Sequence, residues 1–442
     1  MNVTQIFLGI VRQYVFVIVM FYVLLVPKAD VVIYDQIKNV SAGVNNMPYG
    51  VALFSHIFTS TEKGLTTLFE NSFSLPNDMR FNKTGFAFSV MLLDSFKNAT
   101  PTDPYFKRTL NDYIKDCFFT SVLWGEKDLN TVIYSNNIWG EMTSTTHSQN
   151  SYTKTYSSTV PSGQATTCST AYGVLDGQFG TATVASYAAL QSYLQADVVS
   201  ATPTVLQNLL NVGTDATTAM KHAIGVNMIS SAMAETATMT GVSADAVAYA
   251  AALSQQQQRS AWATGGEMAK KYMPIIRQIL EAFIYGMFPV LFLMMLTPLG
   301  GKTLHMYFIM LFWLMLWSPL YAILNLIVNV RAATVLSSSQ NYFAMGTMPL
   351  IYESTNDLVA MAGYMAWAVP MIAFAIAKGS DSALVHLASS IQGSTNLTQN
   401  QAAGAVTGTE GATRMAQAEA HYKAAQSYGG ADIVTTGMAA KA

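Results

Sequence analysis

The stretch from Phe288 to Asn325 consists of two long apolar runs joined at Gly300 and Gly301 by a few small and polar residues. A bilayer core of about 30 Å is crossed by about 20 apolar helical residues, because each residue rises about 1.5 Å. Ala282–Leu299 and Thr303–Val330 contain no Asp, Glu, Lys or Arg. We expect them to form an antiparallel hairpin of membrane helices, with the two glycines as its turn and the following lysine as a headgroup contact.

Two further segments meet the same length criterion. Leu358–Ala377 is apolar, has the length of a span and is flanked by charged residues. Tyr14–Val26 is too short alone, so it crosses only if Ile6–Val11 joins it and Arg12 extends toward the headgroups. A secretory signal peptide is the alternative, but the sequence "VPKAD" places Pro and Lys where a cleavage site needs small residues. We therefore favour an uncleaved anchor.

The composition is that of a membrane protein with a large polar insertion. Only 11% of the 442 residues are charged, against about 25% in ordinary soluble chains, while 51% are hydrophobic. The formal net charge of -2 gives no indication of nucleic-acid binding. We predict a mainly α, polytopic membrane protein with a large aqueous domain between its first and second spans. The predicted division is an anchor at 1–29, the aqueous domain at 30–272, a membrane domain with about three spans at 273–378, and a flexible Ala, Gly, Thr and Gln-rich tail at 379–442.

The aqueous domain has several recognisable segments. From Asp30 to about Leu110, short segments alternate with turn-forming residues. Apolar residues at helical spacing from Phe54 to Phe69 and from Tyr105 to Phe118 each predict a helix with one buried face. Thr143–Thr167 is polar and poor in aromatic residues, which indicates a loop. Thr183–Gln258 is rich in Ala, Met and Gln, so long amphipathic helices are expected in the second half of the domain.

Polar residues in the membrane domain give little indication of transport chemistry. Arg277 and Glu281 have the spacing of an ion pair on one helix, which we place at the interface. Asn325 and Asn329 share a helix face and have the spacing to bond across helices. No charged residue lies deep in a predicted span, although an independent channel or transporter is kept as the alternative function. The prolines of the spans are interpreted as ordinary kinks rather than bends that shape a conduit: Pro289, Pro298, Pro319 and Pro370.

The sequence shows no catalytic, cofactor-binding or metal-binding motif. The segment "GGKT" lacks the spacing of a phosphate loop, since Leu296 stands where the first glycine is required. The six histidines are scattered without ligand spacing. Paired carboxylates that meet only in the folded chain are left as a minor alternative, a lytic enzyme.

The two cysteines, Cys117 and Cys168, both lie in the aqueous domain. The residues leave two alternatives open, namely a pair of unrelated buried thiols or a disulfide. A disulfide would close a loop of about 50 residues and stabilise by about 4 kcal/mol on a chain-entropy estimate. The Lys and Arg residues beside the spans favour a cytoplasmic aqueous domain. That indication is weak, because long segments are translocated largely regardless of their charge.

Several stretches have a characteristic order and spacing: "VVIYDQIKNVSAGVNNMPYGVALFSHIFTSTEKGLTTLFE", "LPNDMRFNKTGFAF", "LNDYIKDCFF", "YSNNIWG", "TTCSTAYGVL", "MPIIRQILEAFIYGMFPVLFLMMLTPLGG" and "WLMLWSPLYAILN". Together they resemble the N-terminal region of TraG-type conjugal transfer proteins, the mating-pair stabilisation subunits of F-like type IV secretion systems. The resemblance covers most of the chain from about Val31 to Asn329. The landmarks that it assigns in and near the hairpin are Pro274, Pro289, Gly300, Gly301, Trp313, Trp317 and Pro319.

The resemblance implies a bacterial inner-membrane subunit whose large domain lies in the periplasm and contains a disulfide between Cys117 and Cys168. It implies a non-enzymatic protein that acts by assembly in pilus biogenesis, mating-pair stabilisation and DNA transfer. The implied partners are other secretion subunits of the inner membrane and periplasm, membrane lipid and, in some members, an exclusion protein of the recipient cell. An oligomeric complex without cofactors or direct nucleic-acid binding is expected.

The chain departs from the family pattern in two places. One span precedes the "VVIYD" element where more are expected, and the sequence ends at Ala442 without the long distal domain assigned to donor–recipient contact and exclusion. Those two activities are therefore left open. Four spans would also place both termini on one side, whereas the family's distal region is expected outside. An error of one in the span count, or a re-entrant piece within Val330–Asn356, would account for this.

Overall fold

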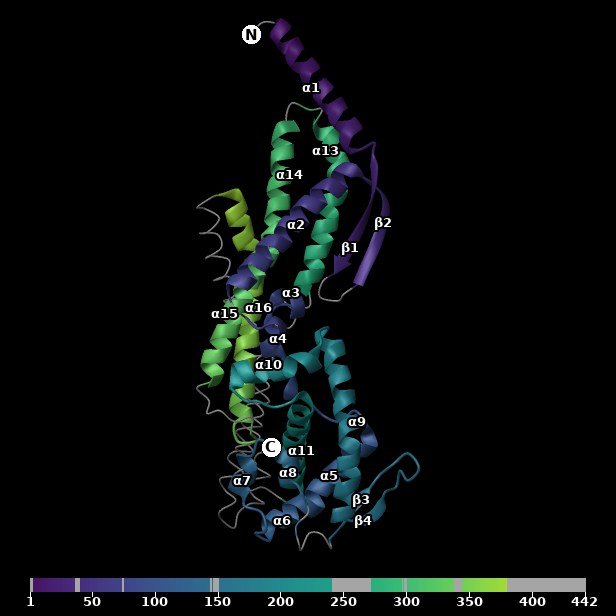
Figure 1. The fold of residues 1–442 in the computed structure, drawn as a ribbon, viewed down its shortest axis with the longest axis vertical. Coiled ribbons are helices and arrows are strands. Elements are labelled where there is room, and N and C mark those ends of the chain that lie inside the picture. Colours follow the sequence, from purple (N-terminus) through teal and green to yellow (C-terminus); the bar gives the residue numbers. More distant parts are fainter. Residues whose placement is uncertain are drawn as a thin grey trace, which may run out of the picture.

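The computed structural model describes residues 3–35, 40–73, 75–143, 145, 151–240, 272–295, 297, 300–337 and 344–379. Over these residues the chain is mainly helical, as predicted, with two short two-stranded sheets. The molecule is elongated (Figure 1). The N-terminus and the hairpin of α13 (Phe288–Met295) and α14 (Gly300–Met315) lie at one end, and the sheet of β3 (Tyr152–Thr155) and β4 (Gln164–Thr167) lies at the other.

Three described helices are long and apolar enough to cross a membrane: Tyr272–Leu291, Gly300–Ser337 and Leu350–Lys378. The predicted spans Thr303–Val330 and Leu358–Ala377 lie within the second and third of them. The first of these helices already includes Tyr272, so it extends beyond the predicted span Ala282–Leu299 toward the N-terminus. The physical reason is that Arg277, which the prediction left outside the span, is paired with a carboxylate inside the protein and does not end the helix.

Helix α1 (Val3–Leu24) is continuous through Arg12. Its purely apolar part, Tyr14–Leu24, is shorter than the three longer apolar helices. The residues before Arg12 therefore do join the apolar run in one helix, which is the condition that the sequence set for a membrane anchor.

The second apolar helix is a long rod with one interruption. After α14, a turn at Leu316 leads directly into α15 (Trp317–Ser337). Pro319 explains this interruption, because it has no N–H to donate to the preceding turn. The 38 residues of the rod are about 57 Å long and the 31 residues of α16 (Met348–Lys378) are about 46 Å long, against about 30 Å for the hydrocarbon core. Both rods therefore extend beyond a bilayer.

An antiparallel β-hairpin connects α1 to helix α2 (Tyr49–Ser72). Its strands are β1 (Lys28–Asp35) and β2 (Val40–Pro48), and the register pairs Lys28 with Pro48. The sequence analysis expected only short segments and turns here. The β-branched run at 31–33 supplies the strand propensity that this expectation overlooked.

Helix α2 lies along the apolar helices with a face that repeats every four residues. Phe54 packs edge-on against Phe288 and Phe308, with ring centroids 5.6 and 5.4 Å apart. Gly50, one turn earlier, approaches α1 and α13 so closely that a Cβ there would lie 2.7 Å from the Phe288 ring and 2.9 Å from the Cβ of Leu24. The predicted helical spacing from Phe54 onward is thus confirmed.

Residues 75–240, here called the globular region, form the other end of the molecule (Figure 1). Its elements in chain order are a 3-10 turn η1 (Asn77–Met79), α3 (Phe81–Thr84), α4 (Phe88–Phe96), α5 (Pro104–Tyr113), a π-helical turn η2 (Ile114–Phe118), α6 (Phe119–Leu123), α7 (Leu129–Ile133), α8 (Ile138–Glu141), β3, β4, α9 (Cys168–Leu194), α10 (Val198–Leu210) and α11 (Ala216–Thr240). The long helices α9 to α11 agree with the prediction for the second half of the domain.

Two predictions for this part of the chain have different outcomes. The helix predicted from Tyr105 to Phe118 is present as α5 and η2, which continue into α6. The loop predicted at Thr143–Thr167 is wrong in part, because β3 and β4 pair within it. Thr153 of β3 is buried and donates a hydrogen bond to Asp116 at 2.9 Å, so a polar strand is held here by polar contacts that hydrophobic spacing does not reveal. Residues 241–258 and the predicted tail at 379–442, apart from Gly379, lie outside the described residues.

Candidate functional site

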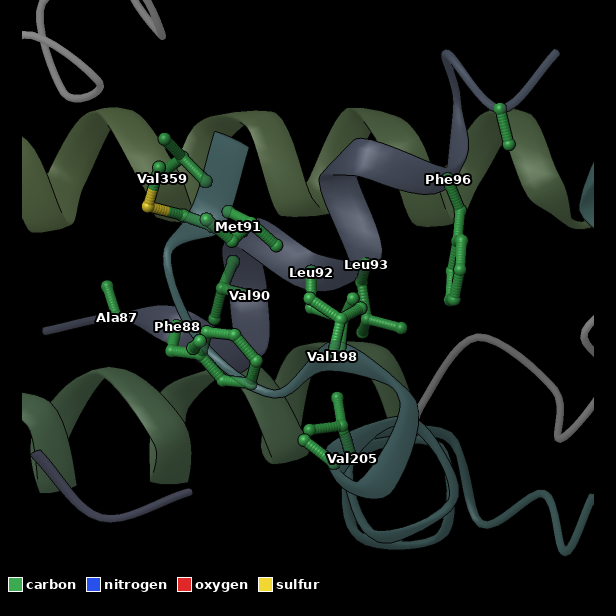
Figure 2. Packing of buried hydrophobic residues seen from close by; sticks show 14 of the residues in the cluster. Ala87, Phe88, Val90, Met91, Leu92, Leu93, Phe96, Val198, Val205 and Val359 are labelled. Carbon is green, nitrogen blue, oxygen red and sulfur yellow. The ribbon is translucent and has the colours of Figure 1, made fainter. Parts of the chain in front are cut away.

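Helix α4 lies at the junction between the globular region and the long helices α15 and α16. All nine of its residues are buried. Figure 2 shows its apolar side chains between Val359 of α16 on one side and Val198 and Val205 of α10 on the other. Burying one large apolar side chain contributes about 1.5–3 kcal/mol. Helix α4 therefore fastens the globular region directly to helices that are long and apolar enough to cross a membrane.

Two asparagines of α15 hold the start of α4 in place. The Oδ1 atom of Asn325 accepts a hydrogen bond from the N–H of Ala87 (3.0 Å), and its Nδ2 donates to the carbonyl of Met79 (2.9 Å). The Oδ1 atom of Asn329 accepts from the hydroxyl of Ser89, and its Nδ2 donates to the carbonyl of Asn325 (2.8 Å). We call this arrangement the asparagine clasp.

The clasp is buried. It supplies hydrogen-bond partners to the N–H of Ala87 and the carbonyl of Met79, which have none within a helix or strand. Asn325 is 1% exposed and Asn329 is 3% exposed. Ala87 precedes α4 in the left-handed region, with φ of 53°, and its side chain offers no cap. The shared helix face predicted for the two asparagines is confirmed, but their partners outside α15 lie in η1 and at the start of α4 rather than in a neighbouring span.

A second polar contact, here called the charge cluster, consists of Glu62, Arg277 and Ser318. Arg277 Nη2 and the Ser318 hydroxyl both donate to Glu62 Oε1, and Arg277 Nη1 donates to Ser318 Oγ at 2.6 Å. It joins α2, the Tyr272–Leu291 helix and α15. The predicted ion pair between Arg277 and Glu281 is wrong, because Glu62 is buried among apolar helices and a buried charge requires a partner.

A third contact satisfies the backbone around Pro370, which lies inside α16. Proline cannot donate to the carbonyl four residues earlier, here that of Ala366. The hydroxyl of Tyr321 donates to this carbonyl at 3.2 Å, and Trp313 Nε1 donates to the carbonyl of Pro370 at 2.7 Å. Trp313 also packs edge-on against Trp317, with ring centroids 5.2 Å apart. Neighbouring side chains therefore donate hydrogen bonds to the backbone carbonyls around Pro370.

Cys117 of η2 and Cys168, the first residue of α9, form a disulfide in the globular region. Their Cα atoms are 5.8 Å apart, and both residues are almost completely buried. The N–H of Cys168 donates to the carbonyl of Ser151 at 2.8 Å, where β3 begins. The pairing implied by the family resemblance is therefore present, and the alternative of two unrelated thiols is wrong.

The remaining landmarks of the hairpin occupy helix starts. Pro274 and Pro289 lie exposed in the first turns of the Tyr272–Leu291 helix and of α13. Gly300 and Gly301 are the first residues of α14 rather than the turn itself, which corrects the prediction. The N–H of Gly300 donates a hydrogen bond to the carbonyl of Thr297 at 3.0 Å. Pro298, another proline of the sequence analysis, lies outside the described residues.

Metal-ligating side chains are dispersed over the described part of the chain. Within it, no group of three or more His, Cys, Asp or Glu side chains is placed to hold a metal ion. His222 is buried, and burial lowers its pKa to about 4. Its Nδ1 accepts a hydrogen bond from the N–H of Ile138 at 3.3 Å. This hydrogen bond joins α11 to the start of α8.

Sequence reasoning missed Glu62 and Ser318 as partners of Arg277. A signal for Glu62 is nevertheless present, because it follows Phe54 and Phe58 at four-residue spacing on the packed face of α2. A carboxylate in that position has to find a cation inside the protein. For Ser318 we find no sequence signal.

The sequence of the chain is similar to those of known proteins. The family model described as "TraG-like protein, N-terminal region" matches residues 2–399. Protein TraG of Escherichia coli (strain K12) is 23% identical over 357 residues, which is 76% of this chain and 36% of that protein. The match thus spans about a third of the relative's length. No solved structure matches. On the extent of the family match, the chain belongs to the family of TraG-like proteins, N-terminal region.

Proposed function

We propose that the chain is a non-enzymatic inner-membrane subunit of a conjugative type IV secretion system. In this proposal it supports pilus assembly, mating-pair stabilisation and DNA transfer through protein–protein assembly. The observation that carries the proposal is the family match over residues 2–399, which makes this a conjugation-related, TraG-like protein. Its partners would be other secretion subunits of the inner membrane and periplasm, together with lipid, in an oligomeric complex.

The architecture fits a scaffold. Helices α15 and α16 carry apolar segments of membrane-spanning length and also pack around α4 of the globular region. The asparagine clasp and the charge cluster fix this packing with buried polar contacts. In this proposal, the chain holds neighbouring subunits of the secretion system at a fixed position relative to the membrane.

We further propose that the globular region lies in the periplasm and that the N-terminus lies in the cytoplasm. The disulfide between Cys117 and Cys168 supports this placement, because disulfides persist in oxidising compartments. The N-terminus and the α13–α14 turn lie at the end of the molecule opposite to the sheet of β3 and β4 (Figure 1), as this topology requires. The Lys and Arg residues beside the spans favour a cytoplasmic domain instead. That indication is weaker, because long segments are translocated largely regardless of their charge.

A deletion strain tests the proposed function. Removing the gene from a donor should abolish pilus formation and plasmid transfer, while the membrane potential and growth remain unchanged. A tagged copy should restore transfer and should co-purify, in mild detergent, with other subunits of the secretion system. Unchanged transfer in the deletion strain would refute the proposal. Ion or solute flux in liposomes that contain only the purified chain would instead favour the channel or transporter.

A further inference from the structure

Helix α2 presents a line of polar side chains on its outward side. His56, Ser60, Lys63 and Thr67 recur at three- or four-residue spacing, which places them on one face of the helix. The first three are exposed and Thr67 is half-buried. Lys63 forms no ion pair with any residue that the structure describes. We call these four residues the polar stripe.

The polar stripe lies beside the apolar rod of α14 and α15. Helix α2 lies across both helices (Figure 1). Phe54 packs against Phe308 with ring centroids 5.4 Å apart, and Glu62 accepts a hydrogen bond from the hydroxyl of Ser318. Ser60 lies between these two contacts along α2, so it is level with the rod between residues 308 and 318.

A bilayer core placed on this rod covers the same level. The run Thr303–Val330 contains no Asp, Glu, Lys or Arg, and a bilayer core corresponds to about 20 helical residues. Every stretch of about 20 residues within that run includes residues 311–322. In the proposed inner-membrane placement, Ser60 and Lys63 therefore lie at the depth of the hydrocarbon core.

The neighbouring apolar helix differs from α2 at this depth. Its residues Phe288 and Arg277 contact Phe54 and Glu62 of α2, so the two helices run in opposite directions and their relative depth is fixed. Ile279 lies between these contacts and is 61% exposed. The outward surface is thus apolar on one helix and polar on the other.

Lipid does not fit the polar stripe. Ionisable side chains within the hydrocarbon core face the interior of a helix bundle or a water-filled space rather than lipid. A dry contact with another protein would bury the Lys63 ammonium group, and it would require a counter-charge together with partners for the imidazole and hydroxyl groups. Water satisfies all of these groups at once, so the composition of the stripe selects water as the occupant.

We propose that the polar stripe borders a water-filled passage at the depth of the hydrocarbon core, with neighbouring subunits as its other walls. Ile57 and Leu68 are also exposed and lie about 100° around α2 from the stripe, where they offer an apolar edge to the next subunit. This inference rests on the proposed function, because one chain leaves the stripe uncovered and an oligomeric complex is needed to close a passage around it.

Cysteine labelling tests the proposal. The two native cysteines are bonded to each other, so an introduced cysteine supplies the only free thiol of the chain. A charged methanethiosulfonate reagent is applied to intact donor cells and to inverted inner-membrane vesicles, which samples access from both sides. In at least one preparation, Ser60→Cys should react at least about tenfold faster than Ile279→Cys, because the reactive thiolate forms in water and not in hydrocarbon. Ile279 is the matched control, since it is exposed at the same depth.

A second pair of positions separates the environment of the stripe from a local effect of one substitution. Lys63→Cys on the stripe and Phe283→Cys on the neighbouring helix, where Phe283 is 68% exposed, should repeat the contrast. Each variant, denatured without reductant, should show a single reactive thiol per chain. This count shows that the native disulfide has formed, and it makes the labelling rates of the variants comparable.

The outcomes distinguish this inference from the proposed function. Labelling of the two stripe variants no faster than that of the two controls would overturn the passage, because the stripe would then face lipid or a dry contact. Fast labelling of all the variants would also overturn it, since this level would then lie outside the bilayer. Fast labelling of the stripe alone, in a strain whose plasmid transfer does not require the chain, would uphold the passage and refute the conjugative role.

Discussion

Asn325 illustrates how much depends on one side chain in this molecule, because it satisfies two backbone groups beside a helix from a distant part of the chain. Replacing it by alanine leaves the N–H of Ala87 and the carbonyl of Met79 without partners, at about 1–3 kcal/mol for each buried group. We expect Asn325→Ala to lower the free energy of unfolding by about 2–5 kcal/mol in denaturant titrations. Thr334→Ala, on the same helix and exposed, should be neutral, and equal effects would contradict the clasp.

His222 gives a prediction for pH. Burial lowers its pKa to about 4, against about 6.5 in the unfolded chain. The unfolded chain therefore binds the proton more tightly, so stability is full above about pH 6.5 and falls as the pH is lowered toward 4. The difference amounts to about 3 kcal/mol. His222→Gln keeps an acceptor for Ile138 and should lose less stability between pH 7 and pH 4, measured by denaturation at several pH values. Parallel pH profiles for the parent and the variant would contradict this account.

At the scale of elements, the crossing of α2 over α1 and α13 depends on Gly50. A methyl group there would lie 2.7 Å from the Phe288 ring and 2.9 Å from Leu24. Gly50→Ala should therefore destabilise by about 1–3 kcal/mol through overpacking. Gly64 lies in the same helix with nothing within 4 Å of its Cβ position, so Gly64→Ala should stabilise by about 0.5–1 kcal/mol. Thermal unfolding in detergent compares the two, and a shift of the same sign in both would refute the close crossing.

The charge cluster makes a prediction about a pair of substitutions. Glu62→Leu alone leaves Arg277 partly buried without its carboxylate, which costs about 3–5 kcal/mol in comparable pairs. The double change Glu62→Leu with Arg277→Met removes both charges and should recover most of that loss. Chemical denaturation of the parent and the three variants, including Arg277→Met alone, forms a double-mutant cycle. Simply additive effects would show that the two residues do not interact.

The elements were predictable where a single period dominates the sequence. Runs without charge predicted the α13–α14 hairpin and the third span, and apolar spacing predicted α2 and α5. The start of the first span, the ribbon of β3 and β4 and the role of Gly300 were not predictable in this way. The ribbon depends on a partner elsewhere in the chain, as Thr153 depends on Asp116, and local spacing contains no information about such partners.

At the scale of the whole molecule, the disulfide makes the free energy of unfolding depend on whether the surrounding compartment is oxidising or reducing. Cys117→Ser with Cys168→Ser should lower the free energy of unfolding by about 2–5 kcal/mol. A reductant should affect the parent in the same direction and leave the double variant unchanged. In spheroplasts, a maleimide should label the two cysteines only after reduction and denaturation, because they are bonded and buried. Labelling without reductant would contradict an oxidised, periplasmic domain.

The contacts that hold the two ends of the molecule together were the least predictable. The asparagine spacing was visible in the sequence, but the sequence separation of 238 between Ala87 and Asn325 allows no inference that they meet. The family resemblance supplied the cysteine pairing, which spacing alone had left open. The charge cluster is a contact of three distant segments, and although the four-residue spacing placed Glu62 on the packed face of α2, neither this spacing nor the resemblance identified its partners.

The length of α15 and α16 has a mechanical consequence. Both rods are longer than a bilayer is thick and pack directly against α4, so continuous helices connect the apolar part of the molecule to the globular region. A small tilt of these two helices would therefore give a larger sideways displacement of the far end that bears β3 and β4 (Figure 1).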